Sequence, residues 1–257
     1  LPIYLFLQEL LLEKAKEALL TIAEETGQLE TLFLVGLPVD KDGRLYNVAA
    51  VLYRGRILGM IPKKNIPMYA EFYEGRHFTP GEETVTEYRL GKQVIPFGSN
   101  LLFRCEELPE LILGCELCED LWVAEPPSTS HALMGATVIA NLSASNETVS
   151  KDDYRTLLIK ASSARLLCGY IYTSAGEGES TQDLVFGGHD LIAENGTLLV
   201  QSARFTTGIL YTDLDVLKIS SERRRMGTFG KRPMKPYLTV PFSMQLTGTK
   251  LDRKIGR

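Results

Sequence analysis

Hydrophobic and polar positions along the chain switch between helical and extended patterns. Residues 7–25 place Leu and Ala among Glu and Lys as an amphipathic helix does, and residues 129–135 and 151–167 also show helical spacing. Apolar runs predict strands at 31–36, 47–53, 57–60, 93–96, 100–104, 111–115, 136–141 and 169–173, followed by a β-rich stretch over 183–213. Gly-containing turns are expected at 42–43, 54–56, 187–188 and 195–196.

This alternation predicts an α/β protein built as a layered sandwich with its helices on the outside. Residues 61–80 form an irregular polar loop, whereas residues 218–257 are basic, rich in Gly and Pro, and weakly periodic. No internal repeat is present, and no domain boundary is evident before about residue 215. We therefore expect one domain over residues 1–215 and a linker-like tail over residues 216–257.

Composition narrows the functional classes. The chain has 257 residues, of which 44% are hydrophobic and 23% charged, which suffices for one large domain with a sizeable core. A net charge of −4 argues against a nucleic-acid or anionic-membrane partner, and no run reaches the length of a membrane span. The one dense basic cluster, Arg223 to Arg225, is interpreted as a solvated face or an intramolecular clamp.

Four cysteines without a dense, regular framework indicate a reducing, cytoplasmic location. The predicted strand at 111–115 leads to Cys118, with carboxylates and a Pro-rich loop just beyond it, which is where an α/β enzyme would hold a nucleophile. Such a thiol needs a base and a cation to become reactive. Cys115 and Cys118 also form a C-x-x-C pair, but the three histidines show no metal-type pairing, so we expect no metal.

Three other segments have candidate chemistry. The loop over 61–78 combines a Pro-Lys step, carboxylates and aromatics, and is interpreted either as a cover over a small polar ligand or as a solvated loop. The strand at 136–141 ends in small polar residues up to Ser145, at the sheet edge where α/β enzymes bind ligands. The Gly-rich segment 175–181 contains two acidic residues and is interpreted as a tight turn rather than a phosphate loop.

Together these segments resemble the nitrilase superfamily of carbon–nitrogen hydrolases. The matching motifs are Pro62-Lys63, Cys118-Glu119-Asp120-Leu121-Trp122, Asn141-Leu142-Ser143-Ala144-Ser145 and Gly176-Glu177-Gly178-Glu179-Ser180, in the order seen in that family. Within it, the chain is similar to the glutamine-hydrolysing domain of glutamine-dependent NAD synthetases from about Phe6 to Phe242. The resemblance implies a four-layer αββα sandwich.

The resemblance also implies the roles of individual residues. Cys118 matches the nucleophile and Lys63 the lysine that stabilises the oxyanion, together with the backbone N–H of Glu119. Glu71 matches an additional carboxylate that orients Lys63 or the substrate amide. The candidates for gripping glutamine are Tyr69, Phe72, Glu119, Trp122 and Ser145.

One departure concerns the general base. The family carries this glutamate in a Phe-Pro-Glu segment on a strand ahead of the first helix of this chain, and residues 1–5, Leu-Pro-Ile-Tyr-Leu, do not match it. We therefore expect the first strand–helix–strand unit of the sandwich to be lacking. Loss of a positioned acid–base group would slow acylation by about 10²–10⁴-fold.

The implied reaction is hydrolysis of glutamine through a thioester on Cys118. Ammonia would pass to a synthetase domain of the same parent protein, which uses ATP and Mg to amidate deamido-NAD. The hydrolase domain itself is expected to need no cofactor, and the protein is expected to form homo-oligomers. Two alternatives remain: a stand-alone nitrilase-like amidase acting on another small amide, and a non-catalytic fragment that has kept the fold.

Overall fold

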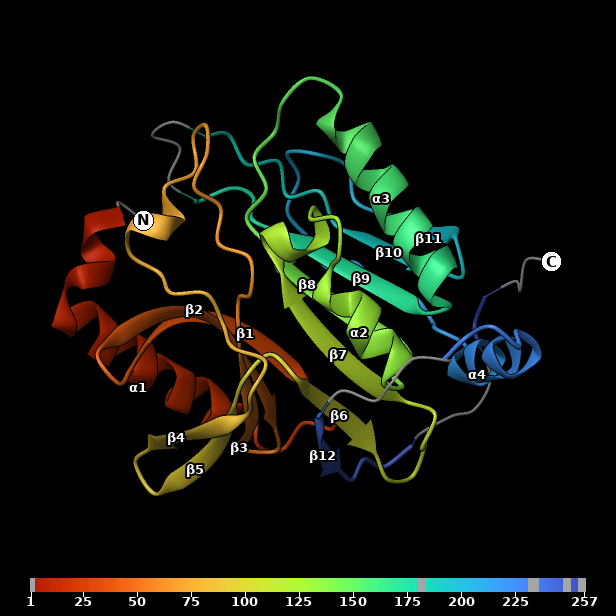
Figure 1. The fold of residues 1–257 in the computed structure, drawn as a ribbon, viewed down its shortest axis with the longest axis horizontal. Coiled ribbons are helices and arrows are strands. Elements are labelled where there is room, and N and C mark those ends of the chain that lie inside the picture. Colours follow the sequence, from red (N-terminus) through yellow and green to blue (C-terminus); the bar gives the residue numbers. More distant parts are fainter. Residues whose placement is uncertain (1–2, 180–183, 231–235, 247–250, 254–257) are drawn as a thin grey trace.

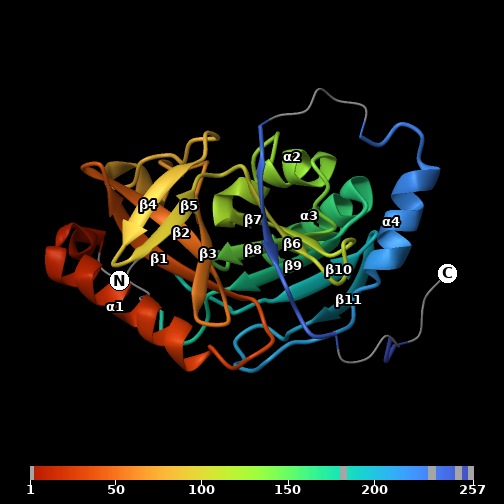
Figure 2. The same ribbon diagram turned by 90° about the horizontal axis from the view of Figure 1, so that it is seen from below.

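Two β-sheets face each other, and helices cover their outer surfaces (Figures 1 and 2). The computed structural model describes residues 3–179, 184–230, 236–246 and 251–253. The first sheet has the order β1-β2-β3-β5-β4 and the second β11-β10-β9-β8-β7-β6-β12. Helix α1 (Glu9–Glu25) covers the first sheet, and helices α2 (Pro127–Leu133) and α3 (Lys151–Leu166) cover the second. The predicted four-layer αββα sandwich is confirmed.

The strands of the first sheet are β1 (Phe33–Lys41), β2 (Arg44–Tyr53), β3 (Arg56–Pro62), β4 (Thr86–Leu90) and β5 (Gln93–Phe97). Those of the second are β6 (Leu101–Cys105), β7 (Ile112–Leu117), β8 (Val138–Ser143), β9 (Gly169–Ser174), β10 (Leu191–Glu194), β11 (Thr197–Gln201) and β12 (Leu238–Phe242). Short 3-10 helices, η1 (Ile3–Leu7), η2 (Glu74–Arg76) and η3 (Cys118–Leu121), and helix α4 (Val216–Arg225) complete the fold.

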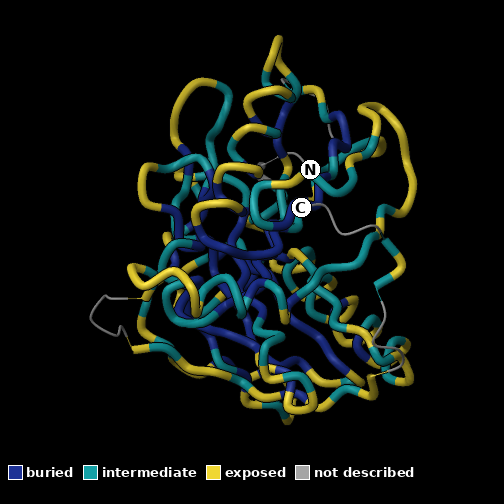
Figure 3. The backbone as a smooth tube through the Cα atoms, turned by 90° about the vertical axis from the view of Figure 1, so that its right-hand side faces the viewer, coloured by how far each residue is buried: buried dark blue, intermediate teal, exposed yellow. Residues whose placement is uncertain are grey.

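Strand alternation creates three apolar layers. On β2, Val51 faces the core between the two sheets, whereas its neighbour Leu52 faces the layer beneath α1. The outer face of the second sheet packs against Ala132 of α2 and Ile159 of α3. Figure 3 shows the buried backbone concentrated in the interior strands, with exposed segments around them. These three interfaces are what a four-layer protein requires.

The turns predicted at 42–43 and 54–56 are confirmed, and each of them closes a β-hairpin. Asp42 and Gly43 connect β1 to β2, Arg54 and Gly55 connect β2 to β3, and all four residues have positive φ. Two positive-φ residues in succession match the right-handed twist of paired antiparallel strands. Both strand pairs are antiparallel; β1 and β2 stay in continuous register, whereas the register of β2 with β3 shifts between Val51 and Leu52.

The structure differs from expectation in two places. Strand β4, which pairs with β5, was not predicted, because Thr86–Leu90 buries only two of its five residues. Part of the expected linker-like tail is built into the fold: α4 buries Val216 and Ile219, and β12 pairs in parallel with β6 at the sheet edge. Short elements such as these have too few positions to show a clear period. The domain boundary near residue 215 stays a prediction.

Arg223 of α4 acts as the intramolecular clamp that was one interpretation of the basic cluster. Its guanidinium donates to the backbone oxygens of Leu166 (3.0 Å) and Leu167 (2.9 Å) at the end of α3, and to that of Ala136 (2.6 Å) after α2. The C-terminal ends of the two helices are thereby tied to one side chain. No helix in the described part of the chain is long and apolar enough to cross a membrane.

Candidate active site

Cys118 lies in a sharp turn where β7 ends and η3 begins. Its backbone φ of +47° falls in the left-handed region. Such a conformation costs a non-glycine residue on the order of 1–3 kcal/mol and persists only where surrounding contacts impose it. Cys118 is partly exposed, whereas Cys105, Cys115 and Cys168 are buried. Solvent therefore reaches the thiol of Cys118 but not that of Cys115.

Two side chains hold this turn. The N–H of Cys118 donates to Oδ1 of Asn141 at the end of β8 (3.1 Å). The N–H of Leu117 donates to Oδ2 of Asp120 (3.0 Å), whose Oδ1 accepts from both the backbone and the side-chain nitrogen of Asn65 (2.8 Å each). Burial raises the pKa of Asp120, against the effect of these hydrogen bonds and of Lys63. Asp120 thus joins the turn that holds Cys118 to the loop that carries Lys63.

Lys63 immediately follows β3 and is only 1% exposed. Its Nζ lies 2.5 Å from Oε2 of Glu74, and its backbone N–H donates to Asn47 (2.8 Å). Burial lowers the pKa of Lys63, but its electrostatic interactions with Cys118, Glu74 and Asp120 and its hydrogen bond to Glu74 outweigh that effect and raise the pKa overall. Lys63 is therefore a buried cation whose charge acts on Cys118.

Glu74 takes the position on Lys63 that was one of the two options for Glu71. The Oε1 of Glu71 instead accepts a hydrogen bond from Nδ2 of Asn146 (2.5 Å), so Glu74 and not Glu71 is the carboxylate bonded to Lys63. Both glutamates belong to the same irregular loop, and spacing alone does not distinguish them. Glu71 lines the pocket, and its contact with the substrate amide stays a prediction.

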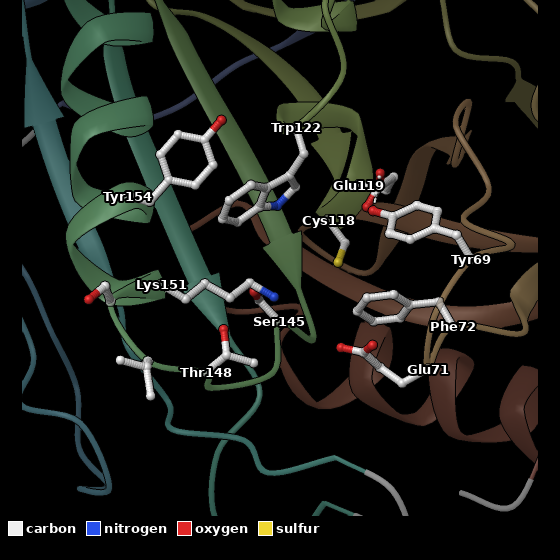
Figure 4. Close-up of a pocket in the computed structure, with 12 residues that line it drawn as sticks. Tyr69, Glu71, Phe72, Cys118, Glu119, Trp122, Ser145, Thr148, Lys151 and Tyr154 are labelled. Atoms are coloured by element: carbon white, nitrogen blue, oxygen red, sulfur yellow. Dashed lines mark hydrogen bonds between the residues drawn. The ribbon is translucent and has the colours of Figure 1, made fainter.

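A pocket of about 460 Å³ opens in front of Cys118 (Figure 4). All five residues predicted to grip glutamine line it, together with Cys118 and Glu71: Tyr69, Phe72, Glu119, Trp122 and Ser145. They come from the 61–80 loop, from η3 and the residue after it, and from the end of β8. Lys63 is absent from the lining because it lies buried behind the pocket wall.

The carboxylate of Glu119 is fixed at the pocket by Tyr69. The Tyr69 hydroxyl donates to Oε1 of Glu119 (2.8 Å), and its ring meets that of Phe72 edge-to-face at 5.8 Å. Burial, together with this hydrogen bond, raises the pKa of Tyr69, so the phenol keeps its proton. Glu119 consequently presents a negative charge beside two aromatic walls.

Lys151, the first residue of α3, was not predicted and supplies a positive charge to the same pocket. Its amine points between Ser145 and Cys118 in Figure 4, hydrogen-bonds Asn146 and lies 5.4 Å from the Trp122 ring centre. Burial lowers the pKa of Lys151, and the nearby Arg155 adds to this effect. A cation in the first helical turn opposes the helix dipole. That conflict was the signal in the sequence that could have identified it.

Ser145 is positioned from behind by a buried ion pair. Arg155 of α3 lies 2.9 Å from Oε1 of Glu147 and donates to Oγ of Ser145 (3.3 Å). Arg155 also contacts Nδ1 of His189 (3.0 Å). Because Oγ accepts from Arg155, the hydroxyl hydrogen of Ser145 is directed to a different partner.

The Gly-rich segment forms the predicted turn as far as it is described. Gly178 has a φ of +96°, and a Cβ on Gly176 would meet the Cα of Gly188 at 3.1 Å. Ser180 and Thr181 lie outside the described residues. Its described residues, up to Glu179, are absent from the lining of the Cys118 pocket.

Known proteins are similar to this chain in sequence and in fold. Residues 2–224 match the family described as carbon-nitrogen hydrolase. Glutamine-dependent NAD(+) synthetases are similar in sequence: that of Mycobacterium bovis is 45% identical over 225 residues, which cover 87% of this chain and 33% of the relative. That of Mycobacterium leprae is 40% identical, covering 94% and 37%. The chain thus spans about a third of the length of these relatives.

Solved structures of such proteins are similar to this chain in fold. A glutamine-dependent NAD(+) synthetase from Cytophaga hutchinsonii superposes with a TM-score of 0.69 and 28% identity, covering 78% of this chain and 32% of that one. A carbon-nitrogen hydrolase from Helicobacter pylori also gives a TM-score of 0.69, at 19% identity over 88% of this chain and 78% of that one, and shows the shared fold.

Proposed function

Because the chain belongs to the carbon-nitrogen hydrolase family, we propose that it hydrolyses the side-chain amide of glutamine through a thioester on Cys118. One observation carries the proposal. The pocket holds a partly exposed thiol together with a carboxylate, Glu119, and an ammonium, Lys151. Two opposite charges suit the α-ammonium and α-carboxylate of a free amino acid, while the thiol suits attack on its amide.

The chemistry begins with the thiol. The Cys118 sulfur attacks the amide carbon, and the carbonyl oxygen gains negative charge next to the Lys63 cation. The C–N bond then breaks, and the thiol proton leaves with the amide nitrogen as ammonia. Water hydrolyses the thioester to glutamate and restores the thiol.

A backbone N–H group is the second oxyanion donor in this proposal. The N–H of Cys118 is already bonded to Asn141, so the following N–H, that of Glu119, is the one we assign to the oxyanion together with Lys63. Backbone N–H groups held in place in this way favour the charged intermediate without reorganising during the reaction.

We further propose that the ammonia serves an ATP- and Mg-dependent synthetase domain of the same parent protein, which amidates deamido-NAD. The names of the synthetase relatives support this proposal, and so does the fraction of their length that the chain spans. The hydrolase domain would bind no cofactor of its own. Self-association and a cytoplasmic location stay predictions.

The test is intact-protein mass spectrometry after exposure to the L- and D-forms of a diazoketone glutamine analogue. We expect one adduct with the L-form, none with the D-form, and none in Cys118→Ala. An equal reaction with both enantiomers, or an adduct that persists in Cys118→Ala, would contradict the proposal. Faster ammonia release from simple aliphatic amides than from glutamine would instead favour a general amidase.

A further inference from the structure

Three buried polar side chains stand side by side behind the nucleophile turn. Glu116 lies on β7, Asn141 on β8 and Tyr170 on β9, three neighbouring parallel strands of the second sheet (Figure 1). Each is at most 1% exposed. Among the described residues, no Lys, Arg or His forms an ion pair with Glu116, and a buried carboxylate without a cation is costly. Its presence two residues before Cys118 therefore needs an explanation.

Hydrogen bonds connect Glu116 to the backbone of Cys118. The Tyr170 hydroxyl donates to Oε1 of Glu116 and accepts from Nδ2 of Asn141 (3.4 Å). Oδ1 of Asn141 in turn accepts from the N–H of Cys118 (3.1 Å). The other carboxylate oxygen of Glu116 accepts from the N–H of Ser128 at the start of α2 (2.7 Å). Every donor in this chain points toward Glu116.

An ionised carboxylate sets this direction because it can only accept. Tyr170 must then give its single hydrogen to Glu116, which leaves its lone pairs to face the Asn141 amide. Asn141 therefore turns its NH₂ toward Tyr170 and its oxygen toward Cys118. With the amide rotated by 180°, two donors would face each other at the N–H of Cys118. Glu116 is absent from the pocket lining, so it acts through these residues and not on substrate.

We propose that Glu116 is a positioning residue, whose buried negative charge fixes the Asn141 amide and thereby holds Cys118 in its strained, reactive turn. The inference rests on the proposed function only in taking Cys118 as the reacting group. It assigns to the sheet behind the site a role in catalysis that the pocket residues do not reveal.

The charge of Glu116 depends on its surroundings, and the test uses a pH at which the carboxylate is ionised. Burial and the charge of Asp120 raise the pKa of Glu116 to about 7, against the hydrogen bonds from Tyr170 and Ser128, which lower it. The experiments are therefore run at pH 8.

The principal variant is Glu116→Gln, which has the size of glutamate but carries an NH₂ group. Its single oxygen serves either Tyr170 or Ser128, and the NH₂ then opposes the other donor. The matched control is Glu194→Gln on β10 of the same sheet, where an equally buried carboxylate binds the N–H of Asp215 (2.6 Å) and Arg253 (2.7 Å). Both changes remove one buried negative charge, but only the first lies behind Cys118.

The primary measurement is the second-order rate constant for alkylation of Cys118 by iodoacetamide, followed by intact-protein mass spectrometry of the 257-residue chain. The melting temperature of each variant is measured as well. We expect Glu116→Gln to slow alkylation and kcat for glutamine by about 10- to 100-fold, the usual effect of a misplaced reacting group, with KM changed less than about twofold. Glu194→Gln is expected to lower only the melting temperature. Tyr170→Phe breaks the same chain of hydrogen bonds and should also slow the alkylation of Cys118.

The double variant Glu116→Gln/Tyr170→Phe should lose no more than the larger single effect, because residues acting through one chain are not additive. The proposal is overturned if Cys118 is alkylated at the same rate in Glu116→Gln and Glu194→Gln. It is also overturned if the effects of Glu116→Gln and Tyr170→Phe add in the double variant. Should Glu116→Gln not fold, the alkylation rate of Tyr170→Phe decides alone. If Cys118 of the wild-type chain is alkylated faster than Cys118 of Glu116→Gln but the wild type does not hydrolyse glutamine, the proposed function is contradicted and this inference is not.

Discussion

At the scale of single residues, the main feature of the site is the set of charged side chains around the thiol of Cys118. Lys63 is buried, lies 2.5 Å from Glu74, and keeps its proton because Cys118 and the nearby carboxylates favour the charged form. Glu71 lies in the same loop but is bonded to Asn146. Two glutamates three residues apart thus belong to different parts of the site, one behind the pocket wall and one on it.

Glu74→Gln should therefore reduce kcat, because it removes the anion that holds Lys63. We expect a loss of about 10²-fold, at the low end of what acid–base groups contribute, with KM little changed. Steady-state ammonia release measures both constants. Glu71→Gln serves as the matched variant and should change KM more than kcat. A larger loss in kcat for Glu71→Gln than for Glu74→Gln would contradict this role of Glu74.

Lys151→Met should raise KM for glutamine, because the α-carboxylate loses its charged partner. Hydrogen bonds to charged groups contribute about 1.5–3 kcal/mol, which corresponds to roughly a 10- to 100-fold increase in KM. Lys151→Arg keeps the charge and should recover most of the affinity. Alkylation of Cys118 by neutral iodoacetamide is the control reaction, and a loss there equal to the loss with glutamine would argue against carboxylate binding.

At the scale of elements, the facing sheets depend on one close approach. Gly59 of β3 leaves room for Phe103 of β6: a Cβ on this glycine would lie 2.9 Å from the Phe103 ring. Phe103 belongs to the core between the sheets. The absence of a side chain at residue 59 therefore permits β3 and β6 to approach each other across the core between the two sheets.

Gly59→Ala is predicted to lower the free energy of unfolding by about 1–3 kcal/mol, the usual cost of overpacking a core. Urea denaturation measures the change. Gly36→Ala on the edge strand β1 is the matched control, because nothing lies within 4 Å of a Cβ there. Alanine is also favoured over glycine in a strand by roughly 0.5–1 kcal/mol, so this variant should be neutral or slightly stabilising. Equal losses in both variants would refute the packing argument.

At the scale of the whole molecule, the C-terminal segment closes the structure over α2. Tyr237, just ahead of β12, bonds Nδ1 of His131 through its hydroxyl (2.9 Å), and Nε2 of His131 contacts the backbone oxygen of Cys115 on β7 (3.1 Å). One buried imidazole thus joins α2 to β7, the strand before Cys118, and to a segment more than a hundred residues further along the chain. Burial lowers the pKa of His131 to about 4.

His131 should make stability depend on pH. In the unfolded chain the imidazole takes up a proton near its ordinary value of 6.5, whereas in the folded protein it does so only near 4. Its contribution is therefore complete above about pH 6.5 and is lost as the pH falls toward 4, by on the order of 3 kcal/mol. His131→Gln removes this titration, so the stability difference between wild type and variant should shrink from pH 7 to pH 4.5. A constant difference in denaturant titrations would count against it.

Glu116 provides the opposite trend in the same protein. Its pKa is raised to about 7, so its ionisation destabilises the fold as the pH rises from about 4.5 to 7. The pH profile of the wild type alone therefore combines two opposing slopes. Only the difference between wild type and the His131→Gln variant isolates the histidine.

The sequence by itself determined the parts of this protein that depend on local pattern. Period-2 and period-3.6 hydrophobicity predicted most strands and the three main helices, and the paired turn residues predicted the hairpins, because these features depend on near neighbours in the chain. The motifs around Lys63 and Cys118 were recognisable for the same reason, since each lies within a short continuous segment. The five expected pocket residues also came from such segments.

Only the tertiary structure decided which distant side chains meet. Glu74 rather than Glu71 bonds Lys63, Lys151 enters the pocket from the start of α3, and Glu116 reaches Cys118 through two other strands. Strand β12 likewise belongs to the sheet because β6 offers it an edge, not because of its own pattern. Register, loop path and burial are set by packing between segments far apart in the chain, and these choices determine which charges act on the thiol.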